Sequence, residues 1–545
     1  MIELNPLCNH LQAKKEDLQV CLIYPGEPFS GFSSLAISNI YSNLNTIDGV
    51  SCDIGFGTQK LSFFLEKPFV EFDILAFSIT YEEHLFEVIR TLINWNIKPE
   101  RDKREHSSPL IFAGGIGVFY NPAPFLPIFD VIYLGEAEER MEKMFKNLAG
   151  KKNKQELLET MSEFDNIIIS ENYRFQYEKD RIKDFSGDVK KIFRSSEYSR
   201  RLSCSCFITE ETAFKGMALI ELSRGCPEKC RFCVAQAMGL PYREKEIDLI
   251  EKEIKAASKI TNRVGLIGTA VTDYSKMEQL YNLLKKYNMK ASFSSLRVSS
   301  TSDHVLKIVK ESGQKTVTIA PEAGREEKRM ALNKKVTDAQ FFDFCHRLFE
   351  NGAENLKLYF LIGIPEESDE DIEAIVSMTL KFKEIAMYFW KKRKKTGKIT
   401  LSLNPLIPKP FTPMQWFGMP PKNLLDKRIK LLGKLIRKIP NVELTFENTR
   451  NAVIQAVISR GDDRIGIAAI NTIKDKTSFK KSLKELRLKI ELLYTREREK
   501  EELFPWEIVN SGIKKDYLWH EYMKIFEGKP SPACFKGCKA CGLCE

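Results

Sequence analysis

The segment from Cys226 to Cys233 holds three cysteines at a C-x3-C-x2-C spacing. Three thiolates on one short loop can each bind one iron of a cubane iron–sulfur cluster, which leaves the fourth iron without a protein ligand. A zinc knuckle is the alternative, although structural zinc sites take four closed ligands. Cys204 and Cys206 are in principle available as a fourth ligand. The spacing favours the open cluster, with Cys226, Cys230 and Cys233 as its catalytic metal ligands.

The composition indicates a globular chain in a reducing compartment. Its 545 residues predict about three domains. No apolar run is long enough to span a bilayer, and the N-terminus lacks the pattern of a signal peptide. We therefore expect a cytoplasmic protein in which many of the 13 cysteines serve as metal ligands rather than in disulfides. The scattered Cys8, Cys21, Cys52 and Cys345 are interpreted as buried or incidental.

Residues 1–150 predict a Rossmann-like, doubly wound α/β domain. Short apolar runs alternate with helical patterns, as parallel strands and crossover helices do. Ligands bind such sheets at the carboxyl ends of the strands. Four residues in turns after the predicted strands are candidate cofactor contacts. The strands are expected at 20–24, 72–78, 109–113 and 130–134, and the contacts are Gly114, Gly115, Gly135 and Glu136.

Residues 216–416 repeat a strand–helix unit six times, which predicts a partial barrel of parallel strands. Active sites of such barrels lie at the carboxyl ends of the strands, and the three-cysteine loop follows the first of them. Residues 151–215 read as a linker with a small appendage. Residues 417–545 read as a basic, helical region. The barrel strands are expected at 218–222, 263–267, 290–294, 316–320, 355–360 and 398–403.

Several further strand ends carry residues suited to a nucleoside-bearing zwitterion. A carboxylate can accept from ribose hydroxyls, and a guanidinium can bind a carboxylate. Iron–sulfur chemistry with S-adenosylmethionine (SAM) generates carbon radicals, so SAM is the expected ligand. Taken alone, each residue is better explained as a helix cap or part of a surface ion pair, but the shared position at strand ends favours a ligand site for the set. The set is Gly268, Thr269, Ser295, Arg297, Glu322 and Gly363.

The last residues of the chain carry a second cysteine cluster. Cys534, Cys538, Cys541 and Cys544 lie within eleven residues, and the first three repeat the C-x3-C-x2-C spacing. Such compact runs are typical of cubane clusters, so we expect an auxiliary [4Fe-4S] centre. Zinc or a single iron in a four-thiolate site is the alternative.

Taken together, these motifs resemble the radical SAM enzymes that carry an N-terminal B12-binding-like domain. The resemblance covers nearly the whole chain and includes Gly135-Glu-Ala-Glu138, Arg224-Gly-Cys226, Thr272-Asp-Tyr-Ser275 and Ala320-Pro-Glu-Ala-Gly324. It implies that Phe232 lies by the adenine of SAM and that the strand-end set contacts SAM. The Asp-x-His-x-x-Gly motif, whose histidine ligates cobalt in many B12-binding domains, does not follow the first strand. Cobalamin binding without that histidine and a relic domain are both left open.

The resulting hypothesis is an enzyme that cleaves SAM reductively and modifies an unactivated carbon. Methyl or methylthio transfer to RNA or to a protein side chain is expected, with flavodoxin or ferredoxin as the electron donor. The net charge of +10 and the basic runs at 391–395 and 427–438 suggest an RNA substrate, although such runs also serve solubility. The alternatives are a radical rearrangement or oxidation of a small molecule, and a non-catalytic redox sensor that binds nucleic acid.

Overall fold

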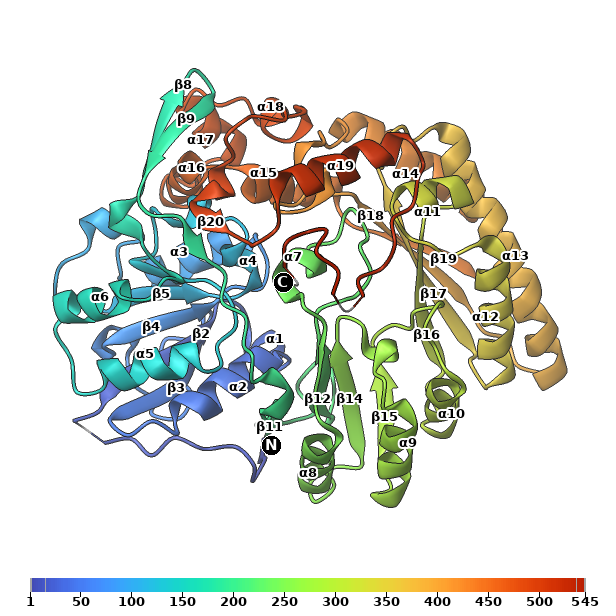
Figure 1. The fold of residues 1–545 in the computed structure, drawn as a ribbon, viewed down its shortest axis with the longest axis horizontal. Helices are drawn as coiled ribbons and strands as arrows, with labels where there is room; N and C mark the ends of the chain where they lie inside the picture. Colours follow the sequence, from blue (N-terminus) through green and yellow to red (C-terminus); the bar gives the residue numbers. More distant parts are fainter. Residues whose placement is uncertain (1, 15, 536, 544–545) are drawn as a thin grey trace. The chain divides into compact units, whose positions relative to one another are not determined.

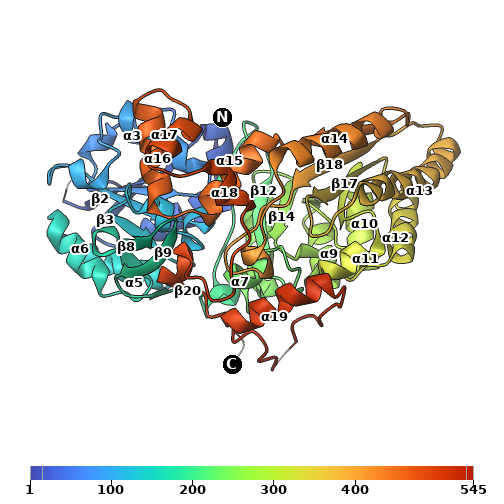
Figure 2. The same cartoon turned by 90° about the horizontal axis from the view of Figure 1, so that it is seen from above.

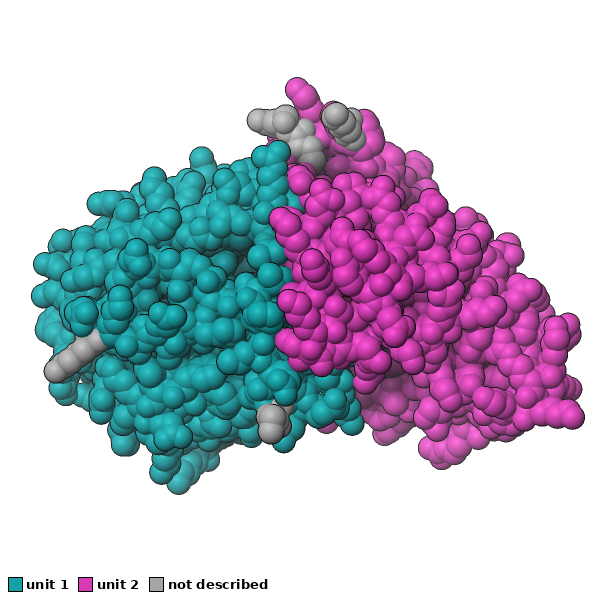
Figure 3. Space-filling view, turned by 90° about the horizontal axis from the view of Figure 1, so that it is seen from below, with its two compact units in different colours: residues 1–217, 457–494, 501–512 teal, residues 218–456, 495–500, 513–545 magenta. Residues whose placement is uncertain are grey.

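The computed structural model describes residues 2–14, 16–535 and 537–543. Within it the chain forms two compact units, each built from segments far apart in the sequence, as Figure 3 shows by colour. Unit 1 contains residues 1–217, 457–494 and 501–512. Unit 2 contains residues 218–456, 495–500 and 513–545. These limits differ from the domain boundaries expected at 150, 215 and 416. Strand pairing extends across residues 150 and 416, as described below.

Unit 1 is organised by a six-stranded sheet of order β3-β2-β4-β5-β6-β7. Its first five strands run parallel, and only β7 is antiparallel to its neighbour. Both faces carry helices, which makes this a Rossmann-like domain (Figure 1). The strands are β2 (Leu18–Tyr24), β3 (Val50–Phe56), β4 (Ile74–Ser78), β5 (Leu110–Gly114), β6 (Val131–Tyr133) and β7 (Ile167–Ile169). The main helices are α2 (Leu35–Leu44), α3 (His84–Asn94), α5 (Arg140–Leu148) and α6 (Lys154–Ser162).

The four strands expected here are confirmed, but the sheet holds two more. The sequence did not predict strand β3, because Asp53 interrupts its apolar run. Asp53 is fully buried, and its carboxylate accepts hydrogen bonds from the N–H groups of Phe64 and Leu65, at 3.1 and 2.9 Å. Strand β7 lies in the segment expected to be a linker, and its pairing with β6 extends unit 1 past residue 150.

Part of the C-terminal region also belongs to unit 1. Helix α16 (Asp463–Lys474) packs on α3, and β20 (Val509–Asn510) pairs with β10 (Lys190–Lys191). The buried amide of Asn121 donates to the carbonyl groups of Ser459 and Gly461, at 3.0 and 2.8 Å. The expected helical region 417–545 is therefore divided between the two units.

Unit 2 contains the partial barrel, and all six expected strands are confirmed. Its strands form two four-stranded sheets, of order β13-β12-β14-β15 and β16-β17-β18-β19. A hydrogen bond from the N–H of Leu296 to the carbonyl of Thr318, at 2.9 Å, connects the edges at β15 and β16. The strands are β12 (Ala218–Arg224), β13 (Arg243–Glu244), β14 (Arg263–Gly268), β15 (Lys290–Phe293), β16 (Thr316–Glu322), β17 (Asn355–Ile362), β18 (Ile399–Pro405) and β19 (Val442–Phe446).

Helices cover the outer side of the barrel strands (Figures 1 and 2). Strand β19 pairs in parallel with β18 and so continues the barrel beyond residue 416. Near the chain's end, α19 (Lys515–Phe526) packs on the short helical turn at 413–416. The covering helices are α8 (Ile247–Ala257), α9 (Met277–Lys286), α10 (Asp303–Glu311), α12 (Asp338–Glu350), α13 (Asp369–Arg393) and α14 (Lys422–Ile436).

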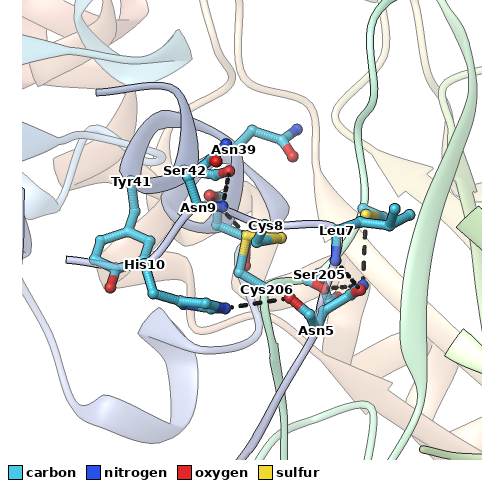
Figure 4. The surroundings of a disulfide bond; sticks show 12 residues. Asn5, Leu7, Cys8, Asn9, His10, Asn39, Tyr41, Ser42, Ser205 and Cys206 are labelled. Atoms are coloured by element: carbon cyan, nitrogen blue, oxygen red, sulfur yellow. Dashed lines mark hydrogen bonds between the residues drawn. A yellow bond between two sulfur atoms is a disulfide. The ribbon is translucent and has the colours of Figure 1, made fainter. Parts of the chain in front are cut away.

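A disulfide in unit 1 joins Cys8 to Cys206, whose Cα atoms lie 5.5 Å apart (Figure 4). The side chain of Asn5 donates to the carbonyl of Ser205 at 2.9 Å and helps to hold the N-terminal segment there. This corrects the interpretation of Cys8 as incidental and removes Cys206 as a free ligand. A separation of 198 residues gave no sequence signal for the pairing.

Candidate functional site

The three-cysteine loop begins where β12 ends. Gly225 permits this turn, because its φ is +85° and a Cβ atom there would lie 2.2 Å from the carbonyl oxygen of Gly239. Cys226, Cys230 and Cys233 are all free of disulfides and partly accessible. The loop therefore offers three unpaired thiols at the carboxyl end of the first barrel strand, as expected.

The thiols of this loop influence one another. The pKa of Cys226 is raised to about 11 and that of Cys230 to about 12, chiefly by burial and in smaller part by the neighbouring cysteines. Iron–sulfur ligation requires thiolates, and bound iron would supply the positive charge that stabilises them. In the described part of the chain, no three His, Cys, Asp or Glu side chains already converge on one metal position. Three soft donors on one loop nevertheless suit iron and sulfide.

Arg297, which follows β15, reaches the cysteine loop. Its guanidinium lies 3.7 Å from the sulfur of Cys226. It also pairs with Asp273 and, at 3.1 Å, with Glu228, and Glu228 in turn pairs with Lys335 at 2.9 Å. The strand-end arginine is thus held beside Cys226 by two carboxylates of the protein. Asp273 belongs to the motif at 272–275, and its role as a partner of Arg297 follows only from the fold.

Glu322, at the end of β16, is buried and has a strained backbone, with φ at +68°. Lys334 pairs with its carboxylate at 3.1 Å. Burial raises the pKa of Glu322, and the ammonium of Lys334 opposes that rise. The charges of Lys334 and Glu322 also act on Cys230. Sequence reasoning missed Lys334, because a lysine in a basic stretch gave no signal of a buried ion pair.

The remaining strand-end residues differ in accessibility. Thr269 and Ser295 are exposed, and Phe232 is partly exposed within the cysteine loop. Gly268 lies against Ser223, because a Cβ atom at Gly268 would be 2.9 Å from the carbonyl oxygen of Ser223. These residues follow strands β12, β14 and β15, so they lie at the end of the barrel that carries the cysteines.

Gly363 is buried, and its backbone N–H is already hydrogen-bonded within the protein. Its N–H donates to the carboxylate of Glu367 at 2.8 Å, and its φ is +83°. Burial raises the pKa of Glu367 to about 7, although Arg428 pairs with it at 2.8 Å. The glycine is thus required for the turn after β17, and its SAM contact remains a prediction.

In unit 1, the four predicted cofactor contacts fall into two pairs. A Cβ atom at Gly114 would meet only Tyr133, at 3.9 Å, whereas a Cβ atom at Gly115 would lie 2.5 Å from the carbonyl oxygen of Ile79. A Cβ atom at Gly135 would lie 2.1 Å from the carbonyl oxygen of Phe193.

Glu136 is engaged by the same segment. Its N–H donates to the carbonyl of Phe193 at 3.0 Å, and its carboxylate accepts from the N–H of Ser195 at 2.8 Å. The backbone of residues 193–195 therefore occupies the space beside Gly135 and Glu136, whereas the space beside Gly114 is open. Cobalamin contacts remain predictions at all four positions.

The tail cysteines lie in unit 2. Cys538 and Cys541 are buried and Cys534 is partly accessible, while Cys544 lies outside the described residues.

None of the described helices is long and apolar enough to cross a bilayer.

Solved structures and curated proteins offer two distant likenesses. The radical S-adenosylmethionine methyltransferase TsrM from Kitasatospora setae, solved with cobalamin and a [4Fe-4S] cluster bound, superposes with a TM-score of 0.50 at 13% identity. The match covers 86% of this chain and all of that one. The tRNA-2-methylthio-N(6)-dimethylallyladenosine synthase of Rickettsia canadensis is 22% identical over 43% of this chain and 60% of its own.

Family membership follows from stronger matches. The uncharacterized protein MJ0966 of Methanocaldococcus jannaschii is 30% identical over 86% of this chain and 94% of its own. Residues 220–379 match the radical SAM superfamily, and residues 37–169 match the N-terminal domain of radical SAM proteins. With the free three-cysteine loop at the end of the first barrel strand, these matches identify the chain as a member of the radical SAM superfamily.

Proposed function

We propose that this radical SAM enzyme transfers a methyl or methylthio group to an unactivated carbon, with RNA as the substrate class. Cys226, Cys230 and Cys233 hold a [4Fe-4S] cluster in this proposal, and the neighbouring strand ends bind SAM. The observation that carries the SAM-cleavage part of this proposal is the contact between Arg297 and Cys226, at 3.7 Å. When bound, the cluster and SAM supply an electron and a carbon radical.

The residues around the loop have separable roles in this proposal. Arg297 binds the carboxylate of SAM beside Cys226, and Asp273 and Glu228 fix its orientation. Glu322 accepts hydrogen bonds from the ribose, and Lys334 keeps that buried carboxyl ionised. The barrel excludes water from the reacting carbon.

Group transfer is supported by the named likenesses, because one is a methyltransferase and the other a methylthiotransferase acting on tRNA. A cobalamin carrier suits this chemistry, and the open surface at Gly114 is compatible with one. The edge at Gly135 and Glu136 is already covered by the segment at 193–195. The space beside Gly115 is likewise filled by the backbone of Ile79. We therefore limit the proposed cobalamin contact to Gly114 and derive no step from it.

An RNA substrate is supported by basic residues exposed at the end of α13. Lys391, Lys392 and Lys394 are exposed there. Two cations of the basic runs have carboxylate partners: Lys395 pairs with Glu354 at 3.2 Å, and Lys427 with Asp369 at 2.9 Å. Four cations of the second run are exposed on α14 or just after it: Lys430, Lys434, Arg437 and Lys438. Ion pairs therefore neutralise part of the positive charge of the two runs, and the rest is exposed at the end of α13 and along α14.

A comparison of cells tests the proposed reaction. RNA from cells lacking the chain, digested to nucleosides, is compared by mass spectrometry with RNA from cells that express it. We expect one nucleoside to lose the mass of a methyl or methylthio group, and expression of a chain with Cys226, Cys230 and Cys233 changed to Ala should not restore it. A mass change confined to a protein would replace RNA as substrate, and no change in either would contradict group transfer to a macromolecule.

A further inference from the structure

The tail cysteines lie directly against the three-cysteine loop. The N–H of Cys534 donates to the carbonyl of Pro227, the residue after the first loop cysteine, at 2.7 Å. At the other end, the carbonyl of Cys541 accepts from the N–H of Lys514 at 3.0 Å. The tail is therefore fixed between the loop and the start of α19.

Two buried side chains fasten the loop to the segment that precedes the tail cysteines. Arg231 is fully buried and donates to the carbonyl of Lys529 at 2.7 Å and to Glu521 at 3.1 Å. Asn333, also fully buried, donates to the carbonyl of Lys229 at 2.9 Å and accepts from the N–H of Ser531 at 2.7 Å. The loop and the tail thus share buried partners.

Lys229 carries the main argument. It lies between two loop cysteines and is only 4% exposed. Its ammonium is 3.6 Å from the sulfur of Cys538 and 5.8 Å from the ring centre of Tyr517. Among the described residues, no carboxylate pairs with it. A buried ammonium requires a negative partner, because its desolvation is otherwise uncompensated. A metal-bound thiolate at Cys538 supplies that charge.

We propose that the tail holds a second iron–sulfur centre and that Lys229 is its buried counter-charge. Cys534, Cys538 and Cys541 are three of its ligands. Cys544 completes the set in the sequence, although it lies outside the described residues. A run of four cysteines in eleven residues can wrap one cubane. The assignment of this centre does not depend on the proposed transfer reaction, because none of its cysteine ligands belongs to the SAM site. Lys229 lies in the three-cysteine loop but is not one of that loop's ligands.

The first test separates the two centres by metal content. The full-length chain with Cys226, Cys230 and Cys233 changed to Ala is reconstituted without oxygen and analysed for iron, sulfide and zinc, with Mössbauer spectra. We expect about four irons and four sulfides per chain to remain. Complete loss of metal would overturn the second centre, and one zinc or one iron instead would overturn its assignment as a cluster.

A second variant guards against misfolding of the first. Cys538→Ser in the otherwise intact chain should lose about four irons and keep about four. The retained cluster should still change its electron paramagnetic resonance spectrum when SAM is added. Unchanged iron content would overturn Cys538 as a ligand.

The role of Lys229 is tested in the triple-alanine background. Lys229→Met should lose at least half of the remaining iron, whereas Lys229→Arg should keep it. Lys539→Met is the matched control, because it removes the same charge from an exposed position between Cys538 and Cys541. Full retention of iron in Lys229→Met, or equal loss in Lys539→Met, would overturn the counter-charge role.

Discussion

The guanidinium of Arg297 lies 3.7 Å from the sulfur of Cys226, although the two residues are 71 positions apart in the sequence. The first barrel strand delivers the cysteine, and the third delivers the arginine. Because Asp273 and Glu228 hold the guanidinium on its other sides, its position is determined before SAM binds. Such preorganisation lowers the entropic cost of ligand binding.

Replacing this arginine should weaken SAM binding. We expect Arg297→Met to raise the SAM dissociation constant by about 10- to 100-fold, the value of one or two charge-assisted hydrogen bonds. Arg297→Lys should recover part of the loss. Equilibrium dialysis with the reconstituted protein measures the effect, and iron content serves as the control for cluster assembly. An unchanged dissociation constant would remove Arg297 from the SAM site.

Glu367 should make folding stability fall as pH rises from about 4.5 to about 7. The carboxyl of the unfolded chain ionises near its ordinary pKa of 4.5, whereas burial raises the pKa in the folded chain to about 7. In this window the folded chain binds more protons, so the free energy of unfolding decreases with pH, by up to about 3 kcal/mol.

Glu367→Gln tests this titration, because it keeps an oxygen for the N–H of Gly363 and removes the ionisable group. Denaturant unfolding of the apo-protein at several pH values should show a smaller slope in that variant. The exposed neighbour Glu366→Gln is the control. Equal slopes in all three proteins would contradict the buried titration.

The glycine turns of unit 1 should respond differently to alanine. Gly135 has a φ of +114°, and a Cβ atom would lie 2.1 Å from the carbonyl oxygen of Phe193, so Gly135→Ala should destabilise the chain by at least about 2 kcal/mol. Gly114→Ala should cost less than about 0.5 kcal/mol, because its Cβ position is open. Thermal denaturation compares them, and similar losses would contradict the described packing.

The end of α13 should contribute to RNA affinity. Changing residues 391–395 to Ser should weaken RNA binding and reduce the dependence of log affinity on log salt by about 0.7 for each phosphate that the variant no longer neutralises. The exposed Lys481 and Lys484, changed in the same way, are the control. Binding that is flat with salt in the unchanged protein would favour a protein or small-molecule substrate.

Local patterns predicted the fold well where strands are buried on both faces. The apolar runs ending at Tyr24 and Ser78 are examples, because parallel strands covered by helices read as continuous hydrophobic stretches. Strand β3 was missed because buried Asp53 resembles a loop residue until its partners in the 63–65 turn are known. The disulfide between Cys8 and Cys206 joins segments that only the fold brings together.

The candidate site also contains one part that the sequence predicts and another part that only the fold reveals. The spacing of Cys226, Cys230 and Cys233 is local, so the sequence contained it. The ion pair of Lys334 with Glu322 and the contact of Lys229 with Cys538 depend on long-range packing. No local pattern distinguishes these buried lysines from the many exposed ones.

Anaerobic SAM cleavage tests the central claim most directly. The reconstituted protein, given a strong reductant and SAM, should form 5′-deoxyadenosine, measured by liquid chromatography and mass spectrometry. The variant with Cys226, Cys230 and Cys233 changed to Ala should form none above the reductant-only background. Robust 5′-deoxyadenosine formation by that variant would contradict the assignment of this loop as the site of SAM cleavage.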